Sequence, residues 1–312
     1  MKGFACELCP RRCMRRPGFC GAGDGPRLFR WGPHFGEEPP LAAGGGSGCI
    51  FFSRCTMKCV YCQNSPWSWR GEGTDRTVGE LAGVMRDLAA KDGCSNWNLV
   101  SPTPYLPYIR EAAGMLAAEG VRLPFVWNSS GYERVETLEE YRELCDVALF
   151  DLRYSSDETA MMLSQAPGYV RHARAAVKWA HENCPGAPGG APGLIVRILV
   201  LPGHSGEAVE SLRWLAGEVS NETHVSIMAQ YTPAYKALEL PPLDRPVERG
   251  EYEAVAEAAE EFGFANGWTQ DFSAADPKLA FLGENMPAGA GPIGESSQCC
   301  KALRKKEPTL LH

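Results

Sequence analysis

The chain has 312 residues, of which 44% are apolar and 22% charged, as in ordinary globular proteins that face water. Its formal net charge of −7 disfavours duplex nucleic acid and anionic membrane surfaces as partners, because both attract basic proteins. No stretch reaches the ~18 uninterrupted apolar residues of a membrane span, and residues 1–16 lack the apolar core of a signal peptide. We therefore expect a cytoplasmic protein that binds neither nucleic acid nor membrane.

Thirteen cysteines are many for a cytoplasmic chain. In a reducing compartment, clustered thiols bind metal more often than they form disulfides. One group lies within residues 6–20 and another within residues 49–62. The adjacent Cys299 and Cys300 suit no single tetrahedral ion, and we assign them no role.

Residues 1–46 are rich in Gly, Pro, Arg and Cys and show no regular period, so we expect a loop-built segment there. From residue 49 the pattern changes to strands that alternate with helices. The expected strands are 49–52, 98–100, 125–128, 147–151, 194–201 and 224–230. Two of the intervening helices carry a Thr-x-x-Glu capping box, Thr77 with Glu80 and Thr137 with Glu140.

Six βα units in series predict an α/β protein with a parallel sheet and right-handed connections. Six is fewer than the eight units of a closed barrel. The predicted fold is therefore a partial (β/α)6 TIM-like barrel with an N-terminal cysteine-rich segment. We divide the chain into that segment at 1–46, the barrel at 47–272 and a C-terminal tail at 273–312 that we expect to be poorly ordered. In such folds the site lies at the carboxyl ends of the strands.

The residues that follow the first expected strand point to a metal cluster. Cys55-Thr-Met-Lys-Cys59-Val-Tyr-Cys62 has the spacing Cys-x3-Cys-x2-Cys. Three thiolates can hold three irons of a [4Fe-4S] cluster and leave the fourth iron free for a cofactor or substrate. A structural zinc ion with Cys49 as fourth ligand is the alternative, but zinc sites seldom lie at the mouth of a βα barrel.

This spacing, directly after the first strand of a βα series, resembles the radical S-adenosylmethionine (SAM) superfamily. Further stretches resemble a subgroup related to pyruvate formate-lyase activating enzymes. These stretches are 32–40, 50–53, 62–64, 127–133, 196–204 and 230–235. The resemblance implies that SAM binds the open iron and that one electron cleaves it to a 5′-deoxyadenosyl radical, which abstracts hydrogen from a substrate.

The resemblance also implies roles for residues at the strand ends. In the family, the position of Tyr61 contacts adenine through its backbone. The positions of Asn128, Ser129 and Asp151 face the methionine end of SAM. Arg197 matches an arginine near the SAM carboxylate, and a salt bridge to Asp151 is the alternative for this buried cation.

One expected contact departs from the family pattern. Ser101-Pro-Thr103 occupies the place where many relatives carry a Gly-Gly-Glu stretch that binds the SAM amino group. This chain has neither Gly nor Glu there. The hydroxyl groups of Ser101 and Thr103 are therefore our candidates to replace that contact.

The N-terminal motif, Cys6-x2-Cys9-x3-Cys13-x6-Cys20, offers four further thiolates. A zinc ion would staple a segment that has almost no hydrophobic core. A second iron-sulfur cluster would relay electrons or bind substrate. A metal-free loop is the third reading, and the spacing does not decide among them.

The leading functional hypothesis is a radical SAM enzyme that abstracts hydrogen from a protein or peptide, as an activase does from a glycyl radical enzyme. A second hypothesis keeps the chemistry but takes a small metabolite or a peptide natural product as substrate. A third is a non-catalytic iron-sulfur or zinc protein that transfers electrons. Since the cluster needs a low-potential electron, we expect a ferredoxin or flavodoxin as donor.

Overall fold

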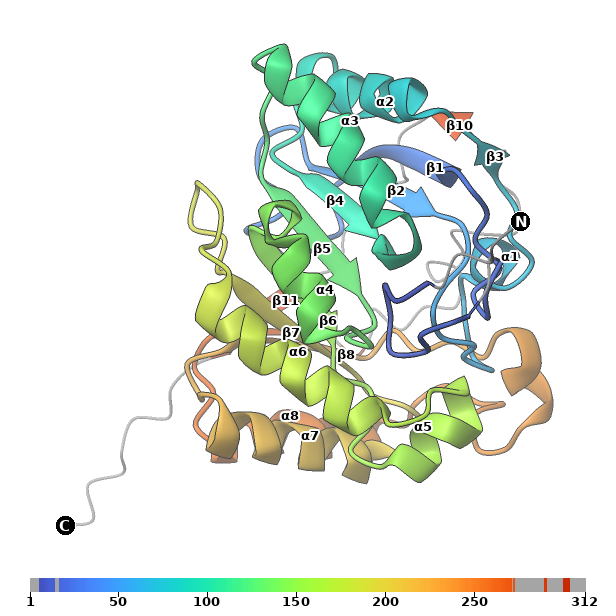
Figure 1. Cartoon of the computed structure of the whole chain (residues 1–312). Coiled ribbons are helices and arrows are strands. Elements are labelled where there is room, and N and C mark those ends of the chain that lie inside the picture. Colours follow the sequence, from blue (N-terminus) through green and yellow to red (C-terminus); the bar gives the residue numbers. More distant parts are fainter. Residues whose placement is uncertain (1–5, 15–16, 271, 273–288, 291–299, 304–312) are drawn as a thin grey trace.

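The computed structural model describes residues 6–14, 17–270, 272, 289–290 and 300–303 (Figure 1). The strands are β1 (Arg27–His34), β2 (Ser47–Phe52), β3 (Thr74–Asp75), β4 (Trp97–Val100), β5 (Phe125–Ser129), β6 (Val147–Asp151), β7 (Leu194–Leu199), β8 (His224–Met228), β9 (Gly267–Gln270), β10 (Gly289–Ala290) and β11 (Cys300–Ala302). The α-helices are α1 (Ser65–Ser68), α2 (Val78–Ala90), α3 (Leu106–Ala118), α4 (Val135–Glu140), α5 (Asp157–Ser164), α6 (Tyr169–Asn183), α7 (Ser205–Glu218) and α8 (Arg249–Glu261). The 3-10 helices are η1 (Thr103–Tyr105), η2 (Arg142–Leu144) and η3 (Tyr235–Glu239).

The expected tail at 273–312 lies largely outside the described residues, Cys299 included. Its described parts are β10 and β11 with Leu303. Across the described ranges, we find no helix with the length and apolar character that crossing a membrane would require.

One sheet holds the described strands in the order β10-β1-β2-β4-β5-β6-β7-β8-β9-β11, with β3 paired to β1. The strands from β2 to β9 along this path are parallel, whereas β1 is antiparallel to β2. The path has two ends, so the sheet is not closed. The longer helices cover one face of the curved sheet (Figure 1). The predicted partial (β/α)6 TIM-like fold is confirmed.

All six predicted strands are present, and the first capping box is confirmed. At the start of α2, Thr77 Oγ1 accepts the Glu80 N–H over 3.2 Å, and Glu80 Oε2 accepts the Thr77 N–H over 2.7 Å. The second capping box is wrong, because α4 begins at Val135 and Thr137 lies inside it. The Thr137 hydroxyl donates instead to the Glu7 carbonyl, 3.5 Å away in the N-terminal segment.

The elements that were not predicted include β1, α5 and β9. The antiparallel pairing of β1 with β2 joins residues 27–34 to the sheet. Helix α5 has eight residues, between the N-cap Ser156 and Gln165, whose φ is 49°. Strand β9 has four residues and pairs in parallel with β8. Elements as short as α5 and β9 carry too few periodic positions for a sequence pattern to show.

The segment between β1 and β2 packs against the amino ends of the central strands. Leu41 lies in one apolar cluster with Val126 and Ile195, on the inner face of β5 and β7. Its carbonyl accepts hydrogen bonds from Ser95 Oγ over 3.1 Å and from Asn96 Nδ2 over 2.8 Å, just before β4. The amino end of the barrel is therefore filled by this chain itself, and the opposite end carries the loops that follow the strands.

Candidate functional site

The three cysteines of the Cys-x3-Cys-x2-Cys motif lie on the loop that leaves the carboxyl end of β2 and leads into α1; we call residues 54–64 the cysteine loop. Backbone hydrogen bonds hold this loop on two sides. The Lys58 N–H donates to the carbonyl of Ser164, the last residue of α5, over 3.0 Å. The Val60 carbonyl accepts the N–H of Ala237 in η3 over 3.1 Å. The fold thus fixes the loop before any cofactor contributes.

Each sulfur of the loop has a hydrogen-bonding neighbour. Ser164 Oγ donates to Cys59 Sγ over 2.9 Å, and Ser68 Oγ lies 3.1 Å from Cys62 Sγ. Cys55 Sγ accepts the backbone N–H two residues further on, over 3.5 Å. Hydrogen bonds to sulfur ligands stabilise negative charge and help set the potential of an iron-sulfur cluster.

Burial makes these thiols poor acids without a cation. It raises the pKa of Cys59 and raises that of Cys62 to about 12. Among the described residues, no three His, Cys, Asp or Glu side chains converge closely enough for one metal ion. The ligands of a cubane cluster bind different irons and stand farther apart than those of a single ion. Cys49, the fourth ligand of the zinc alternative, donates instead to Glu37 Oε1 over 3.6 Å, so the loop offers the three thiolates of a cluster with one open iron.

A buried cation, Arg153, lies beside the loop. Its Nη1 is 4.0 Å from Cys59 Sγ, and its Nη2 donates to Asp151 Oδ2 over 2.5 Å. Asp151 is the last residue of β6, so the strand end holds the guanidinium group in place. A positive charge next to a sulfur ligand favours the reduced, more negative state of a cluster.

A chain of hydroxyl groups runs behind the loop. Tyr61 OH lies 2.5 Å from Tyr154 OH, which in turn lies 2.5 Å from Ser164 Oγ. All three groups are buried. These hydroxyl contacts orient Ser164, which donates to the Cys59 sulfur. The role that the resemblance gives the Tyr61 backbone, toward adenine, stays a prediction.

Asn128 and Ser129, both expected near SAM, point to opposite faces of the sheet, as neighbours on a strand do. Asn128 Nδ2 donates to Asn98 Oδ1 over 3.0 Å, and Asn98 Nδ2 donates to Ser47 Oγ over 3.1 Å. These three side chains form a polar row across the inner face of β5, β4 and β2. Ser129 Oγ instead accepts the Gly131 N–H over 3.2 Å, in the turn after β5.

Of the two candidate hydroxyls after β4, Thr103 donates to Oε1 of Glu133 over 2.7 Å. Burial raises the pKa of Glu133 to about 7, and its Oε2 meets no hydrogen-bond donor in the part of the chain that the structure describes. Ser101 lies at the end of β4 with a φ of 59°. Sequence reasoning missed Glu133, although an acidic residue beside the apolar strand 125–128 was a visible signal.

Arg197 on β7 lies in a buried ion-pair network. Its Nε donates to Glu38 Oε1 over 2.7 Å, and its Nη2 donates to the carboxylates of Glu38, over 2.6 Å, and Glu37. The expected alternative, a salt bridge to Asp151, is wrong, because Asp151 pairs with Arg153. Both glutamates come from the segment that fills the amino end of the barrel. The role of Arg197 toward the SAM carboxylate stays a prediction.

The structure places the four N-terminal cysteines beside the cysteine loop. Arg11, between Cys9 and Cys13 in sequence, donates through Nε to the Thr56 carbonyl over 2.6 Å and through Nη2 to the Gln165 carbonyl. Thr56 lies in the cysteine loop, and Gln165 directly follows Ser164, whose carbonyl accepts the Lys58 N–H. No sequence pattern singles out Arg11 or Arg153, because arginine is common along this chain and only the fold brings these two to the site.

Comparison with known proteins agrees with this site. The sequence model of the Radical SAM superfamily matches residues 49–215, which is more than half of the chain. The protein therefore belongs to the radical SAM superfamily. Its cofactors are accordingly a [4Fe-4S] cluster and SAM, and Cys55, Cys59 and Cys62 are the residues that would hold the cluster.

The uncharacterized protein MJ0674 of Methanocaldococcus jannaschii is 29% identical over 275 residues, which cover 82% of this chain and 75% of that protein. Streptococcus suis SuiB bound to its precursor peptide SuiA is similar in structure over 72% of this chain, with a TM-score of 0.45 and 12% identity. SuiB bound to S-adenosylmethionine is similar over 80% of this chain, again with a TM-score of 0.45 and 12% identity. The chain spans 49% and 60% of those two SuiB chains.

Proposed function

We propose that this protein cleaves SAM reductively and abstracts hydrogen from a protein or peptide substrate, as an activase of a glycyl radical enzyme does. The bound cluster supplies the electron that splits SAM into methionine and a 5′-deoxyadenosyl radical. The chain holds the cluster through the cysteine loop. It donates hydrogen bonds to the sulfur atoms through Ser164 and Ser68, and it presents the charge of Arg153 to Cys59.

The observation that favours a protein or peptide substrate is the distribution of exposed apolar side chains. Eight large apolar side chains are exposed among the described residues, and six of them lie on three segments that contact the cysteine loop. We call these six the apolar rim. They are Met14, Phe19, Met161, Met162, Leu238 and Leu240.

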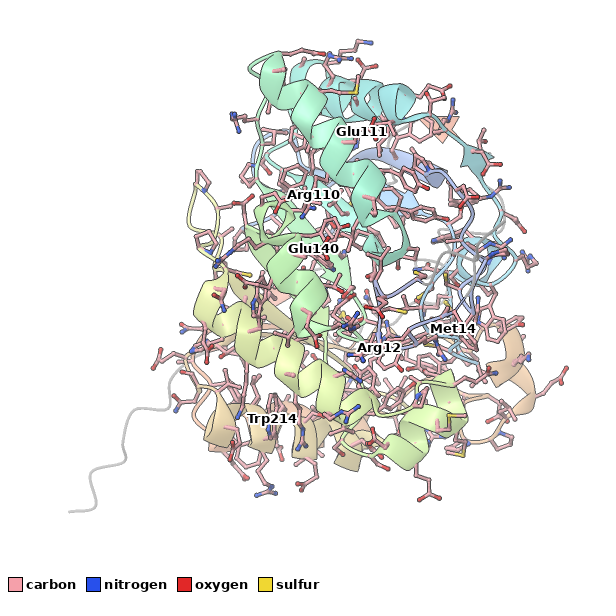
Figure 2. All side chains as sticks on the ribbon, in the orientation of Figure 1. Arg12, Met14, Arg110, Glu111, Glu140 and Trp214 are labelled. Carbon is pink, nitrogen blue, oxygen red and sulfur yellow. The ribbon has the colours of Figure 1, made fainter. Side chains whose placement is uncertain are left out.

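Each of the three segments contacts the cysteine loop through a backbone or side-chain hydrogen bond. The N-terminal segment reaches it through Arg11 and Thr56. Helix α5 accepts a hydrogen bond from Lys58, and η3 donates one to Val60. Figure 2 shows Met14 and Arg12 on the N-terminal segment, on the side of the molecule where Figure 1 places α1 and α5.

Exposed apolar side chains on segments next to a site suit contact with a protein or peptide. Methionine, which supplies three of the six, adapts to partners of irregular shape. A small metabolite is more often enclosed in a pocket with a few polar groups that orient it. The rim therefore favours a protein or peptide over the small-metabolite alternative. We include a ferredoxin or flavodoxin as the electron donor in this proposal.

The test uses anaerobically reconstituted protein with SAM, a reductant and candidate glycyl radical enzymes. We expect an electron paramagnetic resonance (EPR) signal of a glycyl radical on the partner. We also expect deuterium from a glycine-deuterated partner in the 5′-deoxyadenosine product. The Cys55→Ala variant is the matched control and should give neither signal. Deuterium transfer from a labelled small molecule, with none from any protein or peptide, would contradict the proposal.

A further inference from the structure

The N-terminal segment folds so that its four thiols come from one compact loop. The Cys6 N–H donates to the Cys13 carbonyl over 2.6 Å, and these two residues form an isolated antiparallel bridge. The Arg12 N–H donates to the Cys9 carbonyl over 3.1 Å and closes the turn between them. Residues opposite each other in an antiparallel pair have side chains on the same face, so Cys6 and Cys13 face the same way.

Cys20 returns to this hairpin. The N–H of Phe19 donates to Cys13 Sγ over 3.4 Å, which brings the next residue beside the hairpin. Cys20 Sγ accepts the Ala22 N–H over 3.5 Å, so its sulfur has a donor like the sulfurs of the cysteine loop. Cys9 is buried, and its thiol is near enough to those of Cys20 and Cys6 to interact with them electrostatically. The four thiols of this fifteen-residue stretch thus lie near one another, whereas Met14 is 79% exposed.

The hairpin lies against the cysteine loop. Gly21, next to Cys20, lies beside the guanidinium group of Arg54, next to Cys55. The thiols of Cys20 and Cys55 are near enough to act on each other electrostatically. Arg11 closes the contact by its hydrogen bond to the Thr56 carbonyl. The two groups of cysteines are therefore neighbours in space.

We propose that Cys6, Cys9, Cys13 and Cys20 hold a second [4Fe-4S] cluster beside the first. Four thiolates ligate all four irons of a cubane, so this cluster has no open iron for SAM. It would exchange electrons: it takes one from the low-potential donor protein and passes one to the cluster of the cysteine loop. The contact of Arg11 with the Thr56 carbonyl places the four thiols against the cysteine loop, and this position serves a redox centre, whereas a structural zinc ion carries no electrons. This inference goes beyond the proposed function and does not depend on the substrate.

The experiment counts metal on the full chain after anaerobic reconstitution. We expect ~8 iron and ~8 sulfide in the wild type, and ~4 of each in the Cys55/Cys59/Cys62→Ala variant and in the Cys6/Cys13→Ser variant. Cys94→Ser, which removes a buried thiol outside both groups, is the matched control and should keep ~8 iron. With both clusters reduced, the wild-type EPR spectrum should show spin coupling that each cluster variant lacks.

The Cys55/Cys59/Cys62→Ala variant decides the question even if Cys6/Cys13→Ser fails to fold, because its N-terminal cysteines are intact. If it binds no iron, or binds one zinc ion in place of iron, the proposal is overturned. Iron content of ~8 in Cys6/Cys13→Ser would overturn it equally. A wild type that carries both clusters but does not cleave SAM would contradict the proposed function and leave this inference standing.

Discussion

The two ends of the barrel differ in what fills them. The segment between β1 and β2 fills the barrel from its amino end, with Leu41 in an apolar cluster there and with Glu37 and Glu38 paired to Arg197, further along the inner face of β7. At the carboxyl end, the cysteine loop is flanked by segments that leave apolar side chains exposed. The first end is arranged for stability and the second for contact with cofactor and partner. Substitutions in this filling segment or its ion-pair partners should therefore change the free energy of unfolding, and those around the cysteine loop should change potential, pH dependence or binding.

The largest effect on stability is expected for Arg197→Ala. It leaves two buried carboxylates without their cation, which should lower the free energy of unfolding by about 3–5 kcal/mol. Lys91→Ala removes an exposed pair with Asp87 and is the control, at about 1 kcal/mol or less. Chemical denaturation at pH 7 measures both. Equal losses in the two variants would show that the buried ion pairs of Arg197 do not stabilise the fold.

The pH dependence of Arg197→Ala follows from Glu38. Burial opposes ionisation of this carboxyl, but Arg197 outweighs burial and holds the pKa of Glu38 below its usual 4.5. A depressed folded pKa contributes stability above the unfolded pKa and loses it in acid. The difference between wild type and variant should therefore shrink as the pH falls below about 4.5.

At the carboxyl end, Glu133 should make stability fall with rising pH. Its folded pKa of about 7 lies above the usual 4.5, so the folded state keeps a proton that the unfolded state releases. The free energy of unfolding should drop by about 3 kcal/mol between pH 4.5 and 7 from this group. Glu133→Gln should remove that drop, whereas the exposed Glu257→Gln should keep it. An unchanged pH profile in Glu133→Gln would count against a protonated Glu133.

Ser164→Ala tests the hydrogen bond to the Cys59 sulfur. Without the hydroxyl donor, negative charge on the cluster is less stabilised, so its potential should become more negative. Reductive SAM cleavage should slow by about tenfold. Redox titration followed by EPR measures the first effect and 5′-deoxyadenosine formation the second. The control is Ser211→Ala on α7, a buried serine whose hydroxyl has no partner among the described residues. A wild-type potential in Ser164→Ala would exclude the role.

The smallest effect is expected at the apolar rim. Met161/Met162→Ser removes exposed contact area on α5, and we expect KM for a protein substrate to rise by about five- to tenfold. Turnover at saturation should change less, because neither side chain is a ligand of the cluster. Met115→Ser, which removes an exposed side chain on α3, is the matched control. A similar KM in the two variants would favour a small-molecule substrate.

Features that depend on neighbouring residues could be predicted from the sequence, whereas contacts between distant residues could not. The six parallel strands and the Thr77–Glu80 cap rest on local patterns, and the cysteine loop carries its chemistry in eight consecutive residues. The partner of Arg197 lies about 160 positions earlier in the chain, and no local pattern relates the two. Arg153 and Ser164 became visible only when β6 and α5 were placed beside the loop. The predicted cap at Thr137 was wrong because its hydroxyl donates to the Glu7 carbonyl in the N-terminal segment. This tertiary contact overrides the capping pattern.

The central claim is that Cys55, Cys59 and Cys62 hold the cluster that cleaves SAM. The most direct test measures 5′-deoxyadenosine from SAM under reducing, anaerobic conditions, with the wild type and the Cys55/Cys59/Cys62→Ala variant at matched fold by circular dichroism. We predict product from the wild type and none from the variant. Product at the wild-type rate from the variant would contradict the account and move the chemistry to the N-terminal cysteines.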